Sequence, residues 1–414
     1  MEPIVIIGGG PAGLSAAIAA ASSGAPGVIV LERLNRPGAK LLASGGGRAN
    51  VTNTLPVADF VARLGRQGRF AMPALEALGS AALRGWLDEL GVPTICPDGF
   101  GVYPASQRAG DVLAALVRSA GSLGVALRTG VRVVRLRLGG DGCVRGVETG
   151  DGAFIGASAV VLACGGRGYP SLGGSGDGCE LARQAGHEIV TQTPALVPLD
   201  TVEAWPGRCA GLAVSGAKVA IDLPRRRHSR TGDVIFTHHG LSGPAMLDLS
   251  GDVAELLAKY PAVPLAVQWL SDAPAGAWRG RLDQAQRTAG RKLVASVLAN
   301  WLPRRLAEAL CQQAGCGHTA AAQLGATQRD ALTAMLGGAR LTVRATGGFE
   351  RAMVTRGGVA LRGVEPATLA SRHSAGLFLA GELLDLDGPC GGFNLQWAFS
   401  SGRLAGLSAA RGGK

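Results

Sequence analysis

The N-terminal segment joins a short apolar run to a glycine-rich turn. Residues 4–7 suit a buried parallel strand, and Gly8, Gly10 and Gly13 follow in the spacing G-x-G-x-x-G. Small residues at positions 14–21 then favour a helix. In a strand, turn and helix of this kind, Gly8 allows a tight turn, Gly10 lets the backbone approach a pyrophosphate, and Gly13 lets helix and strand pack closely. The segment therefore predicts a dinucleotide site in an α/β sheet.

A second apolar run supports this interpretation. Residues 28–31 suit the next parallel strand, and Glu32 follows 19 residues after Gly13, close to the spacing at which an acid binds ribose hydroxyls. A glycine-rich turn without a ligand is the alternative. Four glycines and a proline interrupt residues 4–21, and no basic segment precedes them, so we do not interpret them as a signal peptide.

Composition limits the class of protein. A chain of 414 residues with 47% hydrophobic content can form two or three units with large buried cores. No uninterrupted apolar run reaches the roughly 18 residues that a membrane span needs, so we expect none. The eight cysteines include no C-x-x-C pair, which indicates reduced thiols and a cytoplasmic protein. Cys311, Cys316 and His318 lack a nearby fourth ligand, so we predict no metal site.

Two further segments are typical of ligand-binding loops. Residues 40–53 carry basic, hydroxyl and amide groups on a glycine-rich backbone, which suits a loop around a polar ligand. Residues 157–163 predict another buried strand, and Cys164, Gly165 and Gly166 stop it. Open α/β sheets bind ligands at the carboxyl ends of their strands, so we expect this end to lie at the site.

The region between these segments predicts regular structure. Residues 111–121 favour an amphipathic helix. Residues 125–138 favour two strands, in which Val131, Val133 and Leu136 face a core.

Five segments, in this order, resemble one flavoprotein family. They are GGGRANVTN at 45–53, LACGG at 162–166, FTHHGLSGPAMLDLS at 236–250, VTRGG at 354–358 and AGELLDLDGPCGGFNLQWAFSSG at 380–402. They resemble the BaiN/RdsA-like family of NAD(P)/FAD-dependent oxidoreductases, flavoproteins of the bile-acid-operon and aminoacetone-oxidase type. The resemblance covers nearly the full length and implies FAD as the cofactor.

The resemblance also implies the architecture, an α/β fold with a Rossmann-like FAD-binding domain that is split in the sequence. The implied parts are residues 1–192 and 353–414 for the FAD-binding domain, and an insert at 193–352 with a small β-barrel (193–275 and about 338–352) and a helical cap (about 276–337). The sequence agrees, because short strands are predicted at 217–223 and 265–269 and helices at 285–336. A stripe at helical spacing predicts ordinary helix packing by Leu293, Val297, Leu298, Trp301 and Leu302.

The C-terminal segment can then be interpreted chemically. A strand predicted at residues 376–380 would deliver Gly381 and Glu382 to a sheet edge, where the resemblance places them against the ribityl chain and phosphates. Residues 391–394 open a predicted helix whose N-terminus would point at the pyrimidine edge of the flavin. Reduced flavin carries negative charge there, and a helix N-terminus stabilises an anion by roughly 0.3–1 kcal/mol. Capping of the helix by Asn394 is the alternative role for that side chain.

The glycine motifs and the resemblance together predict a set of FAD-binding residues. The set is Gly8, Gly10, Pro11, Ala12, Gly13, Glu32, Arg33, Lys40, Ser44, Gly45, Gly46, Arg48, Asn50, Val133, Ala163, Gly165, Gly381, Glu382, Gly391, Gly392, Phe393 and Asn394. Arg48 is the basic residue expected at the cofactor, because a guanidinium suits a phosphate or a flavin anion. Family members often carry cysteine where this chain has Ala49, so a mechanism that needs a thiol in that loop fails here.

Two residues are candidates for proton transfer. His238, beside His239, lies in a family motif, and a histidine titrates near neutrality. Its alternative role is a hydrogen bond between the insert and the FAD-binding domain. Cys390 lies in the predicted flavin-side loop as a proton donor or redox thiol, or alternatively as a small residue that fills a tight loop.

The implied activity is that of an FAD-dependent oxidoreductase. NAD(P)H would reduce the flavin, which would pass hydride to an unsaturated small molecule or to oxygen. Only one full nucleotide fingerprint is present, so a pyridine nucleotide would bind transiently. Two alternatives remain open: a flavin-dependent reductase of uridine in ribosomal RNA, and a flavin-bound RNA-binding or regulatory protein without turnover.

The charge balance bears on these alternatives. The net charge is +11, and Arg225, Arg226, Arg227 and Arg230 form a basic cluster in the insert. Grouped arginines attract phosphates, which would suit RNA. A solvated loop is the alternative.

Overall fold

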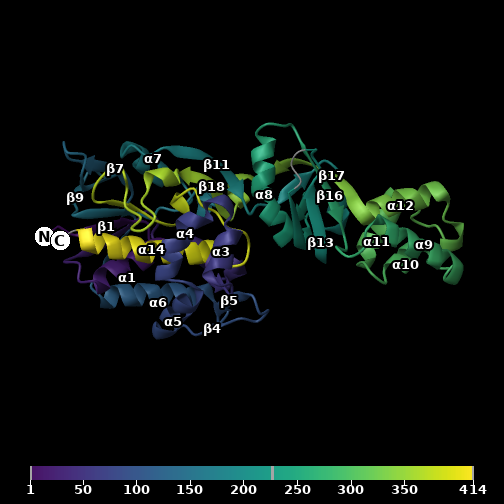
Figure 1. The fold of residues 1–414 in the computed structure, drawn as a ribbon, viewed down its shortest axis with the longest axis horizontal. Coiled ribbons are helices and arrows are strands. Elements are labelled where there is room, and N and C mark those ends of the chain that lie inside the picture. The colour runs from purple at the N-terminus through teal and green to yellow at the C-terminus, as the bar shows by residue number, and fades with distance from the viewer. Residues whose placement is uncertain (1, 225–227, 413–414) are drawn as a thin grey trace. The chain divides into compact units, whose positions relative to one another are not determined.

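The computed structural model describes residues 2–224 and 228–412, which form two compact units (Figure 1). The first unit joins the chain up to Thr193 with the chain from Met353 onward, and the second runs from Pro194 to Ala352. The predicted fold class is confirmed: a Rossmann-type domain in two sequence segments is interrupted by a barrel and a group of helices.

A five-stranded parallel sheet forms the centre of the first unit. Its order is β19 (Leu377–Leu379), β10 (Ala159–Leu162), β1 (Ile4–Ile7), β2 (Val28–Glu32) and β6 (Ala126–Thr129). Every residue of β1, β10 and β19 is buried. Burial on both faces explains why these strands are continuous apolar runs rather than alternating ones.

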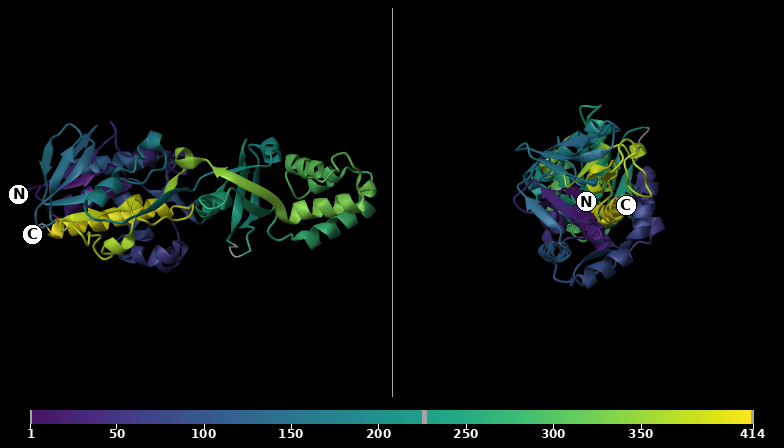
Figure 2. Two further views of the ribbon diagram at one scale, coloured as in Figure 1. Left: turned by 90° about the horizontal axis from the view of Figure 1, so that it is seen from above. Right: turned by 90° about the vertical axis from the view of Figure 1, so that its left-hand side faces the viewer.

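The two ends of the chain meet in a helix pair against this sheet. Helix α1 (Pro11–Ser22) packs along α14 (Phe393–Gly412), as Figures 1 and 2 show. A β-carbon on Gly402 or Gly406 would overlap backbone carbonyl oxygens of α1. The Ser15 hydroxyl also donates to the carbonyl of Phe399 at 2.8 Å. The helices therefore touch backbone to backbone.

Shorter elements surround the sheet. They are α2 (Ala39–Ala43), β3 (Thr52–Asn53), α3 (Val57–Arg63), α4 (Gly68–Ala77), α5 (Ser80–Glu89), β4 (Thr94–Ile95), β5 (Gly101–Pro104), α6 (Ala109–Ser122), β7 (Val133–Leu138), β8 (Val144–Thr149), β9 (Phe154–Gly156), α7 (Asp177–Gln184), β11 (Ile189–Ala195) and β18 (Val354–Val359). In β7 the pairing register shifts between Val133 and Arg135, so Val133 and Leu136 are both buried. Val131 precedes the strand and is half-buried.

A closed barrel forms the first part of the second unit. Its strands, in order around the barrel, are β12 (Leu199–Thr201), β15 (Gly240–Ser242), β14 (Ser229–Phe236), β13 (Ala213–Ile221), β16 (Val263–Gln268) and β17 (Ala339–Thr346). Helix α8 (Pro244–Leu257) packs against β14. The rings of Phe236 and Trp269 stack in its core with centroids 5.5 Å apart.

Four helices follow β16 along the chain and lead into β17 (Figure 2). They are α9 (Ala275–Thr288), α10 (Val294–Leu298), α11 (Arg304–Gln313) and α12 (Ala326–Gly338). The packing stripe predicted here is partly wrong: Val297, Leu298 and Leu302 are buried, but Leu293 is 43% exposed and Trp301 39% exposed. Leu293, Trp301 and Leu302 all lie outside α10, where helical spacing no longer determines which side chains are buried.

Within residues 2–224 and 228–412, no helix combines the length and the apolar character needed to cross a membrane.

The contact between α1 and α14 can be tested by adding a methyl group. We expect Gly402→Ala and Gly406→Ala each to destabilise the fold by about 1–3 kcal/mol, because the new β-carbon overlaps backbone that cannot rotate away. Urea unfolding measures the change. Gly121→Ala is the matched control, since it lies in α6 with open space around it and should raise stability by up to about 1 kcal/mol. Equal effects at all three positions would contradict the packing argument.

Candidate functional site

The three glycines of the first turn have three different surroundings. Gly8 has a positive φ of 109°, and a β-carbon there would overlap the carbonyl of Ala163. A β-carbon on Gly13 would overlap the carbonyl of Gly8. A β-carbon on Gly10 would meet nothing within 4 Å. Gly8 and Gly13 therefore permit close packing, whereas Gly10 faces open space in which a ligand can approach the backbone.

Helix α1 begins at this open space. Pro11 is its first residue, Ala12 follows, and no side chain of the described residues caps its N-terminus. Its first N–H groups and the positive end of the helix dipole therefore suit an anion. The open space beside Gly10 and the uncapped helix end together fit the pyrophosphate of a dinucleotide.

Glu32 lies at the end of β2, beside the turn. Its Oε2 accepts the Gly9 N–H at 2.7 Å, and its Oε1 accepts the Leu34 N–H at 2.8 Å. The carboxylate is thus held against the glycine loop at the carboxyl edge of the sheet. Arg33 instead turns away to the carbonyl of Gly173 at 3.1 Å.

Lys40 and Glu382, both predicted to bind the cofactor, contact each other. Lys40 Nζ lies 2.6 Å from Glu382 Oε2, and Glu382 Oε1 accepts the Thr355 N–H at 2.9 Å. Gly381, with φ of 73°, donates its N–H to the Ser401 hydroxyl at 2.9 Å. The end of β19 is therefore held by residues 40 and 355 on one side and by α14 on the other.

The loop after α2 is joined to the loop before α14. With its side-chain amide oriented so that both ends are satisfied, Asn50 accepts the Gly392 N–H at 3.3 Å and donates to the Thr52 carbonyl at 2.8 Å. Asn53 donates to the Gly391 carbonyl at 2.9 Å. Gly391 and Gly392 have φ of 106° and 83°, and a β-carbon on Gly392 would overlap the Thr52 backbone. Segments more than 300 residues apart in the sequence thus form one surface.

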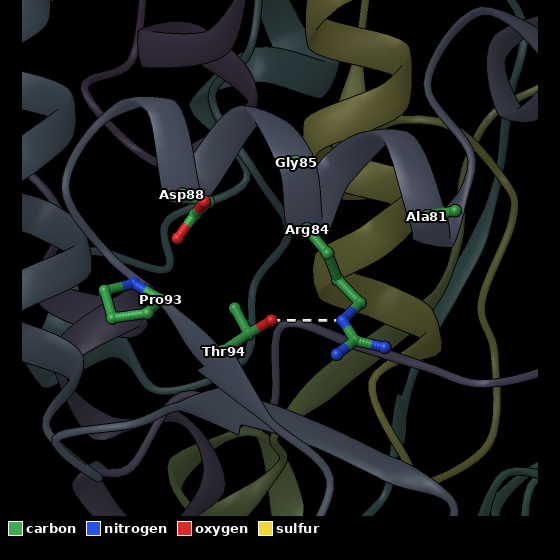
Figure 3. A pocket seen from close by; sticks show the side chains of 6 residues that line it. All are labelled: Ala81, Arg84, Gly85, Asp88, Pro93 and Thr94. Carbon is green, nitrogen blue, oxygen red and sulfur yellow. Dashed lines mark hydrogen bonds between the residues drawn. The ribbon is translucent and has the colours of Figure 1, made fainter.

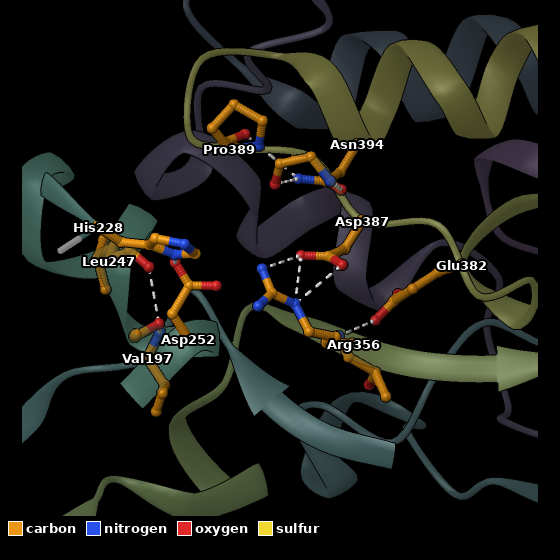
Figure 4. Close-up of polar contacts among 12 residues, drawn as sticks. Val197, His228, Leu247, Asp252, Arg356, Glu382, Asp387, Pro389 and Asn394 are labelled. Carbon is orange, nitrogen blue, oxygen red and sulfur yellow. Dashed lines mark hydrogen bonds and ion pairs between the residues drawn. The ribbon is translucent and has the colours of Figure 1, made fainter. Parts of the chain in front are cut away.

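Asn394 fixes the same loop. Its Oδ1 accepts the Gly388 N–H at 2.9 Å, and its Nδ2 donates to the Gly388 carbonyl at 2.8 Å and the Pro389 carbonyl at 3.4 Å (Figure 4). These bonds join Asn394 to the preceding loop rather than to the first turn of the helix. Phe393 is buried against Phe60, with ring centroids 4.5 Å apart, so its side chain is part of the core.

The glycine segment of residues 44–48 lies at the surface. Gly45 and Gly46 have φ of 57° and 67°, and the Ser44 hydroxyl donates to the Leu41 carbonyl at 2.7 Å. Arg48 is exposed, and its guanidinium carbon lies 4.9 Å from the centre of the Tyr103 ring.

Ala163 and Gly165 follow β10 at the carboxyl edge of the sheet. Gly165 has φ of 70°. Cys164 lies between these two residues. Burial raises the pKa of its thiol to about 12, so this thiol is protonated at neutral pH. Val133 begins β7 and is buried, two residues after Val131, whose N–H donates to the Glu32 carbonyl at 2.9 Å.

The two candidates for proton transfer lie in different units. Cys390 is half-buried in the loop that Asn394 fixes. His238 belongs to the second unit and is exposed in the turn between β14 and β15. The roles of both remain predictions.

The basic cluster is described only in part. Arg225, Arg226 and Arg227 lie outside the described residues. In β14, Arg230 lies 3.9 Å from a carboxylate oxygen of Asp252.

One pair of half-buried charges was not identified from the sequence as part of the site. Arg356 donates from Nε and Nη2 to the carboxylate of Asp387 at 3.1–3.3 Å, and the two side chains are 26% and 13% exposed (Figure 4). Both lie in segments that carried the family resemblance. The sequence offered two signals for this pair: one arginine in the run VTRGGVAL and an aspartate directly before Gly388.

A cavity of about 380 Å³ lies elsewhere, on the face of α5 (Figure 3). Its lining consists of Ala81, Arg84, Gly85, Asp88, Pro93 and Thr94. None of the predicted FAD-binding residues belongs to this lining, so the cavity is distinct from the candidate site.

Comparisons with known proteins agree with this geometry. The family described as HI0933-like protein Rossmann domain matches residues 2–408. The chain is 36% identical to the 3-dehydro-bile acid delta(4,6)-reductase of Clostridium scindens over 99% of both chains. It is 28% identical to the ribosomal RNA dihydrouridine synthase of Escherichia coli over 96% of this chain and 95% of that one.

Solved structures show the same fold at lower identity. The open conformation of a flavocytochrome c3 fumarate reductase aligns with a TM-score of 0.55 and 19% identity over all of this chain and 78% of that chain. The 3-ketosteroid delta1-dehydrogenase of Sterolibacterium denitrificans aligns with a TM-score of 0.54 and 13% identity over 99% of both. The predicted family and enzyme class are therefore confirmed: the chain belongs to the HI0933-like Rossmann domain family and is an FAD-dependent oxidoreductase.

Proposed function

We propose that this enzyme reduces a carbon–carbon double bond conjugated to a carbonyl group in an apolar polycyclic molecule of the 3-oxo steroid class. The observation that carries the proposal is the 36% identity, over 99% of both chains, to a 3-dehydro-bile acid delta(4,6)-reductase. Proteins of this similarity share a fold, but the substrate depends on side chains at the site, so the substrate class is the part that needs testing.

The residues of the first unit have distinct roles in this proposal. Gly10 and the N–H groups at the start of α1 would hold the pyrophosphate, and Glu32 would bind a ribose hydroxyl. The backbone of Gly391 and Gly392 would lie at the pyrimidine edge of the flavin. When bound, FAD supplies the chemistry of hydride acceptance and donation.

Reduction of the double bond requires a hydride on one carbon and a proton on the other. NAD(P)H is the proposed hydride source. The proposed proton donors are Cys390, in the loop that Asn394 holds, and His238. A histidine is suited to this step because its ordinary pKa lies near neutrality. We place the reaction in the cytoplasm, where all eight thiols stay reduced.

Uridine in ribosomal RNA is the second candidate substrate. Two ribosomal RNA dihydrouridine synthases, from Escherichia coli and Haemophilus influenzae, are each 28% identical to this chain. The net charge of +11 would favour a polyanion. A uridine ring also contains a double bond conjugated to a carbonyl group, so the same site chemistry would serve either substrate.

Anaerobic mixing tests the electron donor and the acceptor in turn. We expect NADPH or NADH to remove the visible absorbance of the oxidised flavin, and a 3-oxo-4,6-diene bile acid to restore it while gaining two hydrogen atoms. Oxygen and a uridine-containing ribosomal RNA fragment are the comparison acceptors. Reoxidation by the RNA but not by the steroid would replace the first proposal with the second. Failure of both nicotinamide donors would refute that electron source.

The role of Gly10 is tested by Gly10→Val. We expect FAD affinity to fall at least about tenfold, which is about 1.4 kcal/mol, because the added methyl groups occupy the open space at the turn. The stability of the FAD-free protein should change by less than about 0.5 kcal/mol, since Gly10 has an extended backbone with φ of −81°. Fluorescence titration with FAD measures the affinity. Gly110→Val, also beside open space at a helix start, is the control that should bind normally.

Asn394→Asp tests the electrostatics at the start of α14. The substitution keeps the shape, removes the two donated bonds to the loop and adds a negative charge. Reduced flavin is an anion, so we expect its two-electron midpoint potential to fall by roughly 10–40 mV, equivalent to about 0.5–2 kcal/mol. Spectroelectrochemical titration measures the potential. Asn394→Ala separates the effects, because an equal shift in that variant would show that charge is not the cause.

A further inference from the structure

Three segments outside the predicted FAD site meet at a pair of histidines. His187 lies just before β11, Gly363 lies at the end of the turn after β18, and His373 lies in the turn before β19. All three belong to the first unit. The two imidazole rings lie with centroids 4.8 Å apart and planes at 87°.

The two rings direct one nitrogen each toward the same small space. A β-carbon on Gly363 would lie 2.9 Å from His187 Nδ1 and 2.9 Å from His373 Nε2. Gly363 has no side chain, so no β-carbon occupies this space. Any larger residue at position 363 would fill it.

His187 needs a partner in this space. It is 3% exposed, and its Nδ1 has no hydrogen-bond partner among the described residues. A buried polar nitrogen without a partner is costly and uncommon. Its other nitrogen, Nε2, lies 2.8 Å from the Ser371 hydroxyl, which fixes the ring. With Nε2 bonded to the Ser371 hydroxyl, Nδ1 is the ring nitrogen left available for a ligand.

We infer that His187 Nδ1 and His373 Nε2 bind one divalent late transition metal ion, of the kind represented by Cu²⁺, Ni²⁺ and Zn²⁺. Imidazole is a common ligand of these ions, with metal–nitrogen distances of about 2.0–2.1 Å. An ion at that distance from both nitrogens, with a tetrahedral angle between them, separates the ring centroids by roughly 5 Å, close to the 4.8 Å observed. Ser371 takes the place of the outer partner that usually orients a metal-binding histidine.

The surroundings limit the affinity and define the role. Residues 2–224 and 228–412 contain no cluster of three His, Cys, Asp or Glu side chains suited to a metal, so the proposed site has two protein ligands and would take its other ligands from water. The nearby carboxylates of Glu188 and Glu365 are paired with Arg362 and Arg372. The ion would link the chain entering β11, which carries His187, to the turn before β19, which carries His373. The ion would therefore stabilise the fold and take no part in the proposed reaction.

The experiment uses the untagged, full-length, FAD-bound protein with accessible thiols alkylated. We expect one equivalent of Cu²⁺ to give an electron spin echo modulation pattern of two imidazoles. Calorimetric titration with Ni²⁺ should give one site, and the ion should raise Tm by mass action. His373→Gln changes an exposed residue, and Gly363→Ala keeps both histidines but fills the space. Each should weaken Ni²⁺ binding at least tenfold.

His318→Gln is the matched control, because it removes an exposed histidine from the second unit and should leave binding unchanged. A pattern of one imidazole, no site in the unaltered protein, or unchanged affinity in both His373→Gln and Gly363→Ala would overturn the inference. These outcomes are independent of the steroid and RNA assays.

Discussion

The backbone contact between α1 and α14 is the constraint on which the first unit depends. Gly402 and Gly406 let the last helix lie directly on the first, at positions where any side chain would overlap carbonyl oxygens of α1. Gly8 and Gly13 do the same between the first turn, β10 and α1. Glycines thus form both sets of contacts. They let the two sequence segments of the first unit, which residues 194–352 separate, pack within about one helix diameter of each other. This packing places the loop before α14 near the turn after β1.

This arrangement produces a candidate site made mostly of backbone groups. Four of the charged side chains around it form two pairs, Lys40 with Glu382 and Arg356 with Asp387. Paired charges contribute little net field, whereas the uncapped N–H groups of α1 remain directed at open space. A pyrophosphate would therefore be held by dipoles that folding has already fixed, rather than by flexible cations. Binding would then lose little side-chain entropy.

The sequence predicted the local parts of this arrangement well. The order of apolar run, glycine turn, helix and acid specifies β1, α1 and β2 because each element depends on neighbours within about 30 residues. Pairs such as Asn50 with Gly392, or Arg356 with Asp387, were not predicted. Their partners are set by the sheet order and by the helix contact, which periodicity does not encode. The exposure of Leu293 and Trp301 was missed for a related reason, since helical spacing was applied beyond the ends of the helix.

The difference between contacts made by the backbone and contacts made by side chains explains why relatives with different substrates can share this chain's fold. Where backbone groups would hold the cofactor, the residues are glycines, which permit close approach. Glycines have no side chain with which to select a substrate. A steroid reductase and an RNA reductase can therefore keep equivalent loops at 45–53 and 388–394 while differing elsewhere. Exposed side chains on those loops, such as Arg48 over Tyr103, are not needed to close the fold. Residues of this second kind can therefore change without disturbing the glycine contacts, which makes them the positions where substrate choice can differ between relatives.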